Sequence, residues 1–161
     1  MKREMKCLDR DEELTPLGQL VARLPVEPSL AKMVIVGAMF HHGDAMCVLA
    51  ASDSIKAEIF YHGTDQTRLT FRQRSFAGDR HSDHVALLSA FYAYEQVRLG
   101  QGSHAEINFC EQQSLSFSTL RVLFEARNQL RDLLISFGFA ESVVTPKVPR
   151  LLKLFITTLL F

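Results

Sequence analysis

The sequence predicts a mainly all-α protein built as a helical bundle. Apolar residues recur at the three- and four-residue spacing of amphipathic helices in several separate segments. Residue types that begin and end helices stand at the edges of these segments. The apolar share of 47% over 161 residues is enough to fill a core, so extensive disorder is not expected.

The first half of the chain predicts three helices. The first covers residues 14–24, where Thr15 can cap the helix and Pro16 suits its first position. Pro25 and Pro28 then require a short extended connection. The second helix runs to residue 40 after a cap at Ser29, and the third runs from a cap at Asp44 to about residue 51.

The second half predicts a long connection and then three more helices. Residues 52–80 are polar and lack periodicity, which indicates a surface connection with at most one short helix. Helices are expected from residue 85 to about 99 after a cap at Ser82 or Asp83, over 105–112, and over 118–136 before Gly138.

Composition excludes several classes of protein. Eighteen basic and eighteen acidic residues cancel, which argues against general coating of polyanions but permits local basic patches. Three cysteines without a C-x-x-C pair support neither a zinc ribbon nor a disulfide framework, so a reduced intracellular compartment is the simplest expectation. The charged N-terminus lacks the apolar segment of a signal peptide, and no apolar run is long enough to cross a bilayer, so no membrane is expected.

Two histidine clusters could hold a metal ion, one at His81, Asp83 and His84, the other at His41, His42 and Asp44. Both aspartates also stand where a helix needs an N-cap, and the ligand spacing matches no established template. We therefore favour capping and expect no metal site. A metal-dependent hydrolase is the remote alternative.

Motifs for catalysis are absent from the sequence. It contains no G-x-x-x-x-G-K-[ST] phosphate loop, no D-E-A-H motif and no G-x-S-x-G nucleophile elbow. We therefore expect no catalytic residue, no cofactor in this chain and no ATP hydrolysis by the chain alone.

Basic residues are the candidates for nucleic-acid contact. Four arginines and two phenylalanines alternate over a short stretch, which suits phosphate contact and base stacking but equally suits a solvated loop: Arg68, Phe71, Arg72, Arg74, Phe76 and Arg80. Arg127 falls inside the apolar stripe of the last helix. A charge there must snorkel, pair or meet a ligand, and we favour a buried ion pair over an RNA phosphate.

Three stretches resemble the helicase-associated region of DEAH-box RNA helicases, and the residues at 82–85 are most similar to those of the RNA helicase A (maleless) group. The first holds LTPLG at 14–18, LPVEP at 24–28 and LAKM at 30–33; the second is FAGDRHSDHVALL at 76–88; the third holds FCE at 109–111, Leu115, TLR at 119–121, QL at 129–130 and GF at 138–139. Their order and spacing agree over about residues 12–140. Tyr94 stands where the family usually has tryptophan.

The resemblance implies a domain order and a function. Residues 1–28 would end a winged-helix domain, residues 29–140 would form the ratchet-like bundle, and residues 141–161 are a divergent apolar tail. Such a bundle packs beside RecA-like motor domains, which bind ATP and Mg²⁺, and forms one wall of the channel for single-stranded RNA. The resemblance also implies a protein of the nucleus, with the cytoplasm as a second location left open.

A wall of this kind needs small polar donors and a few cations at helix starts. The predicted RNA-binding residues are Ser114, Ser116, Ser118, Thr119, Arg121, Arg127, Arg72 and Arg74. Capping by Ser116 or Ser118 explains part of this pattern equally well. The competing class is a protein-interaction module that docks on motor domains or on a regulatory partner.

Overall fold

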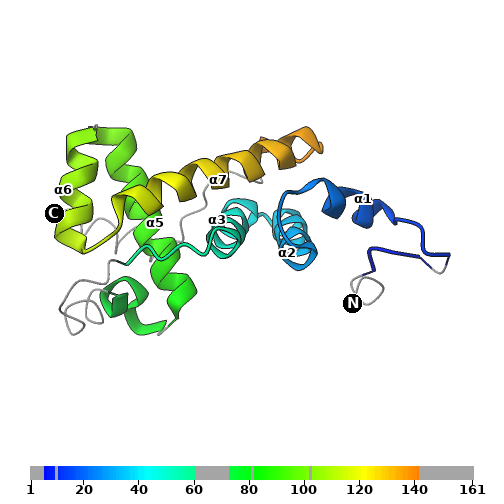
Figure 1. Ribbon diagram of the computed structural model, residues 1–161, viewed down its shortest axis with the longest axis horizontal. Helices are drawn as coiled ribbons and strands as arrows, with labels where there is room; N and C mark the ends of the chain where they lie inside the picture. Colours follow the sequence, from blue (N-terminus) through cyan, green and yellow to red (C-terminus); the bar gives the residue numbers. More distant parts are fainter. Residues whose placement is uncertain (1–5, 10, 61–72, 81, 102, 142–161) are drawn as a thin grey trace. The chain divides into compact units, whose positions relative to one another are not determined.

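The structure, a computed structural model, describes residues 6–9, 11–60, 73–80, 82–101 and 103–141. Helices dominate these residues (Figure 1), which confirms the mainly all-α class. Within the described ranges the extended backbone pairs only as two isolated antiparallel bridges, Leu8 with Leu14 and Phe60 with Leu115. None of the helices in these ranges is long and apolar enough to cross a membrane.

Contacts divide the chain into two compact units. Unit 1 comprises residues 1–56 and 125–147, and unit 2 comprises residues 57–124 and 148–161. The long helix α7 (Phe117–Ser136) gives its first turns to unit 2 and the remainder to unit 1. The winged-helix boundary at residue 28 and the tail from residue 141 remain predictions; residues 142–161 lie outside the described part of the chain.

Unit 1 begins with the short helix α1 (Pro16–Arg23), which starts as the sequence predicts. The Thr15 hydroxyl accepts the Gly18 N–H at 3.0 Å, and Pro16 occupies the first turn. Gly18 is buried against the preceding segment: a Cβ built there would lie 2.0 Å from the carbonyl oxygen of Cys7. The sequence therefore needs glycine at this contact.

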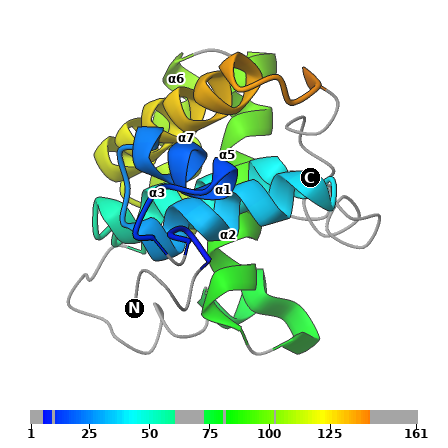
Figure 2. The ribbon, with the colours of Figure 1, turned by 90° about the vertical axis from the view of Figure 1, so that its right-hand side faces the viewer.

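Helices α2 (Pro28–Met39) and α3 (Gly43–Ser54) pack on each other in unit 1, and α1 lies beside α2 (Figure 2). Two predicted caps are wrong. The α2 cap is Glu27, because Pro28 already occupies the first helical position. The α3 cap is His42, and Asp44 lies inside the first turn with 2% of its surface exposed.

Unit 2 places α5 (Asp83–Gln101) and α6 (Ser103–Gln113) side by side (Figure 1). Before α5, residues 73–77 form one helical turn followed by the 3₁₀ turn η1 (Gly78–Arg80). The prediction of a surface connection over 52–80 is partly wrong: α3 continues to residue 54, and Ile59 and Phe76 are both buried. Both lie in segments without a helical repeat of apolar residues, so periodicity does not reveal that they are buried.

The buried stripe of α7 consists of Leu120, Leu123, Leu130 and Leu134. Gly138 ends the helix as predicted, with a positive φ of 94° and its N–H donated to the carbonyl of Ile135 at 2.9 Å.

Candidate nucleic-acid interface

The start of α7 is a capped helix N-terminus. The Ser116 hydroxyl accepts the N–H of Thr119 at 3.3 Å, and the Ser116 carbonyl accepts the N–H of Leu120 at 3.0 Å. Hydroxyl contacts also join Ser116 to Ser118 at 3.3 Å and to Thr119 at 2.8 Å. The expected capping by Ser116 is therefore present.

A short-range turn and a long-range contact hold this helix start in place. Ser114 adopts a positive φ of 57°, and the next N–H, of Leu115, is donated to the carbonyl of Cys110 at 2.8 Å, which reverses the chain after α6. The Ser116 N–H is donated to the Ile59 carbonyl at 2.7 Å, beside the bridge between Phe60 and Leu115. The segment before α5 thus fixes where α7 begins.

Four of the predicted contact residues accompany Ser116 at this end of α7. Ser118 and Arg121 are exposed, while Ser114 and Thr119 are half-buried. The Arg121 guanidinium carbon lies 5.7 Å from the centre of the Phe117 ring. Apart from the Thr119 N–H, which Ser116 caps, the first-turn N–H groups have no intrahelical acceptor. This end therefore combines backbone donors, hydroxyl groups and one cation, which together can hold an anion such as phosphate.

Arg127 does not join that group. Its side chain is 0% exposed, and its guanidinium donates to the carboxylate of Asp44 at 2.7 Å in unit 1. The favoured expectation of a buried ion pair is what the structure shows. A side chain without exposed surface offers nothing to an RNA phosphate, so we remove Arg127 from the contact set.

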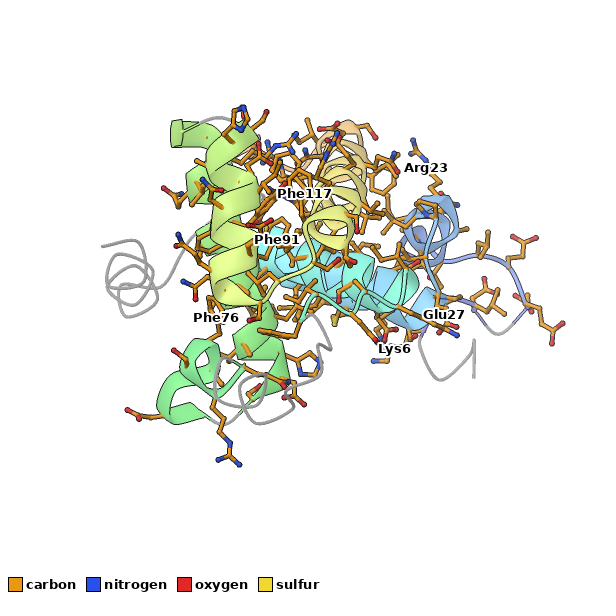
Figure 3. All side chains as sticks on the ribbon, turned by 60° about the vertical axis from the view of Figure 1, so that its left-hand side comes forward. Lys6, Arg23, Glu27, Phe76, Phe91 and Phe117 are labelled. Atoms are coloured by element: carbon orange, nitrogen blue, oxygen red, sulfur yellow. The ribbon has the colours of Figure 1, made fainter. Side chains whose placement is uncertain are left out.

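The arginine- and phenylalanine-rich stretch is described only in part. Arg74 is exposed on the turn 73–77 of unit 2. Arg72 lies outside the described residues, as do Arg68 and Phe71. Phe76 is 1% exposed and its ring packs 6.0 Å from that of Phe60, so it is a core residue and not a stacking surface for bases (Figure 3).

One polar cluster in unit 2 was missed from the sequence. The Tyr94 hydroxyl donates to Glu106 at 2.7 Å, and Arg98 donates to the same hydroxyl at 3.3 Å. The Arg98 guanidinium also stacks over the Phe124 ring of α7 at 4.4 Å. The spacing of Tyr94 and Arg98, four residues apart on one helix, is a signal that could have suggested their contact. Nothing local indicates Glu106 or Phe124.

The ionisable groups whose pKa is raised, one in this cluster and two buried thiols, carry no sign of a nucleophile. Burial, followed by the hydrogen bond to Glu106, raises the pKa of Tyr94 to about 12. Burial and then nearby carboxylates raise the pKa of Cys47 and of Cys110 to about 12 each. Protonated thiols and a protonated phenol are poor nucleophiles, so these side chains serve packing and hydrogen bonding.

The histidine clusters do not converge on a metal site in the part of the chain that the structure describes. Groups of three or more histidine, cysteine and carboxylate ligands do not occur there. Asp44 is engaged by Arg127, Asp83 accepts the Gln73 amide at 3.0 Å, and His42 lies 2.7 Å from the Phe40 carbonyl. His81 lies outside the described residues.

Comparison with known proteins shows that the chain is homologous to a segment of DEAH-box helicases, consistent with their helicase-associated region. It is 37% identical to the human ATP-dependent DNA/RNA helicase DHX36 over 146 residues. The matched region covers 91% of this chain and 14% of that protein. It is 38% identical over 135 residues to the Arabidopsis thaliana DExH-box ATP-dependent RNA helicase DExH1, covering 84% of this chain and 13% of the relative.

A third relative, the mouse putative ATP-dependent RNA helicase DHX57, is 30% identical over 145 residues, or 90% of this chain and 10% of its own length. No family model matches the chain. The chain therefore spans about one seventh or less of the length of these relatives. The finer resemblance to the RNA helicase A group stays a prediction.

Proposed function

We propose that this chain is an accessory RNA-binding module of a DEAH-box ATP-dependent RNA helicase and forms part of its channel for single-stranded RNA. The homology to RNA helicases supports the class of function. The capped start of α7, with exposed Ser118 and Arg121, is the observation that carries the contact role. Hydroxyl and backbone donors hold a sugar–phosphate backbone without reading bases, which stepwise movement along RNA requires.

The chemistry of ATP belongs to other parts of such a helicase. This sequence has neither a phosphate loop nor a D-E-A-H motif, and both are needed to hold nucleotide and Mg²⁺. In the proposal, RecA-like motor domains bind ATP and Mg²⁺ and move RNA past this module. The proposed location is the nucleus, with the cytoplasm as the second candidate.

Titration of a fluorescent oligouridine with the 161-residue chain tests RNA binding by anisotropy. We expect saturable binding that weakens steeply as salt rises, because phosphate contact releases counterions. Arg121→Ala should lower the affinity roughly tenfold by removing a charged hydrogen-bond donor. Lys56→Gln removes an exposed cation at the end of α3 in unit 1 and should leave the affinity unchanged. Absence of binding by a folded chain at low salt would contradict the proposal.

A second candidate function is docking on motor domains. Met39 and Phe40, at the end of α2, are 66% and 71% exposed, and adjacent large apolar side chains of this kind favour a protein contact. Calorimetric titration with purified motor domains of a DEAH-box relative tests this role. The double variant Met39→Ser/Phe40→Ser should weaken that binding and leave RNA affinity unchanged. Equal binding by variant and unchanged chain would rule out this surface.

A further inference from the structure

One side of the first turns of α7 alternates aromatic rings and cations. Phe117, Arg121 and Phe124 follow one another at four- and three-residue spacing, so they share this side of the helix. Arg98 reaches it from α5 and stacks on Phe124 at 4.4 Å, while Arg121 lies 5.7 Å from the Phe117 ring. Two guanidinium groups therefore lie along one stripe of α7, and both belong to unit 2.

The orientation of Arg98 is set by contacts with side chains of α5 and α7. The ring of Phe124, on which Arg98 stacks, is itself stacked on the ring of Phe91 of α5 (labelled in Figure 3). The two ring centres are 6.4 Å apart, with an interplanar angle of 29°. The Tyr94 hydroxyl accepts from Arg98 at 3.3 Å. Tryptophan has a ring N–H donor but no such acceptor, so tyrosine at position 94 gives this chain a contact that the usual tryptophan of the family could not make.

The pairing of Arg98 with Glu106 is loose. The two side chains are 3.6 Å apart at the Glu106 Oε2 atom, which already accepts the Tyr94 hydroxyl at 2.7 Å. Charge-assisted hydrogen bonds of a well-formed pair are about 2.7–2.9 Å long. The Arg98 side chain is also 26% exposed. A guanidinium stacked on a ring keeps its five N–H donors in its own plane, so it can meet a phosphate at its exposed edge alongside its protein partners.

We propose that Arg98 is a further RNA-binding residue, which holds a backbone phosphate of single-stranded RNA next to the one held by Arg121 at the start of α7. This inference rests on the proposed function and extends the contact surface from one helix to two. The Arg98 guanidinium stacks on the Phe124 ring and the Arg121 guanidinium lies over the Phe117 ring, so both cations are positioned by an aromatic ring before RNA arrives. Preorganised side chains lose little conformational freedom on binding.

The test is the salt dependence of oligouridine binding by the whole chain. For single strands, the slope of log affinity against log salt changes by about 0.7 for each phosphate contact. Arg98→Met retains an unbranched stem that can pack on Phe124 but removes the charge. We expect it to lower the slope by about 0.7 and the low-salt affinity roughly tenfold. Arg98→Lys keeps a charge and should retain most of the slope.

Arg23 provides a matched control. Its guanidinium carbon lies 4.5 Å from the centre of the Phe137 ring in unit 1, nearly the same distance as that of Arg98 from Phe124 (Arg23 is labelled in Figure 3). Arg23→Met should leave the slope unchanged. Thermal unfolding of every variant separates loss of fold from loss of contact, since a merely structural Arg98 would lower the melting temperature without altering the slope.

The possible results are distinguishable. An unchanged slope in Arg98→Met, with a reduced slope in Arg121→Ala, overturns the role of Arg98 and leaves the proposed function standing. Absence of RNA binding by the unchanged chain overturns both. If Arg98→Met fails to fold, Arg98→Gln decides, because it keeps a polar side chain but also lacks the charge: a slope lower by about 0.7 supports the proposal, and an unchanged slope contradicts it.

Discussion

Arg127 and Asp44 form an ion pair of 2.7 Å whose side chains are 0% and 2% exposed. The pair joins α7 to α3 within unit 1 across 83 positions of sequence. Removing two charges from water is costly, and the close contact offsets that cost only while both partners are present. The stability of unit 1 therefore depends on the pair as a unit.

Arg127→Met should lower the free energy of unfolding by about 3–5 kcal/mol, because it leaves the Asp44 carboxylate buried without its cation. Urea denaturation followed by circular dichroism measures this loss. The double variant Asp44→Asn/Arg127→Met should recover part of it, since the buried Asp44 carboxylate is then removed as well. A loss below about 1 kcal/mol in the single variant would contradict the interpretation.

Alkaline pH should destabilise the fold. Burial and the neighbouring Asp44 raise the pKa of Cys47 from 9.0 to about 12, so between these values the unfolded thiol loses its proton while the native thiol keeps it. The free energy of unfolding then falls as pH rises through this window, at up to about 1.4 kcal/mol per pH unit for one such group. Urea midpoints at pH 8 and pH 10 measure the fall. Cys47→Ala should make it shallower, and an equal fall in both proteins would refute the assignment.

Gly18→Ala should destabilise unit 1 by roughly 2 kcal/mol or more, because the new Cβ would meet the Cys7 backbone carbonyl, which cannot turn aside. Gly100→Ala is the matched control: a Cβ there has nothing within 4 Å, and alanine favours the helix by about 1 kcal/mol. Thermal melting should therefore shift in opposite directions. A neutral Gly18→Ala would show that the approach of Cys7 is not rigid.

Tyr94→Phe should cost about 1–3 kcal/mol of unfolding free energy, because the variant removes the donor that satisfies the buried Glu106 carboxylate at 2.7 Å. Differential scanning calorimetry measures the change. Adding Glu106→Gln to this variant should restore some stability by removing the charge. An unaltered melting temperature in Tyr94→Phe would mean that Glu106 finds another donor.

Local chemistry predicted much of the fold. Thr15 with Pro16 and Gly138 mark real helix ends, because capping depends on neighbours within four residues. The same reasoning failed at Asp44. This residue type suits an N-cap, but Asp44 is the second residue of α3 and pairs with Arg127 instead. A residue type suited to a cap is equally suited to a buried ion pair, and only the distant partner separates the two.

The candidate site was predicted at the start of α7 but not at its side. Ser116 and Arg121 could be found because helix starts and exposed cations are visible in a local window. The stacking of Arg98 on Phe124 joins residues from separate helices, and its geometry depends on how α5 packs against α7 in unit 2. Because the two residues lie far apart in the sequence, no local pattern of residues predicts that they are in contact.

Because unit 1 is assembled from residues 1–56 and 125–147, its first part leaves the ribosome well before its second. Asp44 must wait for the translation of 83 further residues before Arg127 can neutralise it. During synthesis, helices α1 to α3 would therefore form an intermediate in which the surface that later packs on α7 is still exposed. Chaperones bind exposed apolar surfaces of this kind. Completion of α7 is the synthetic step at which this intermediate can close.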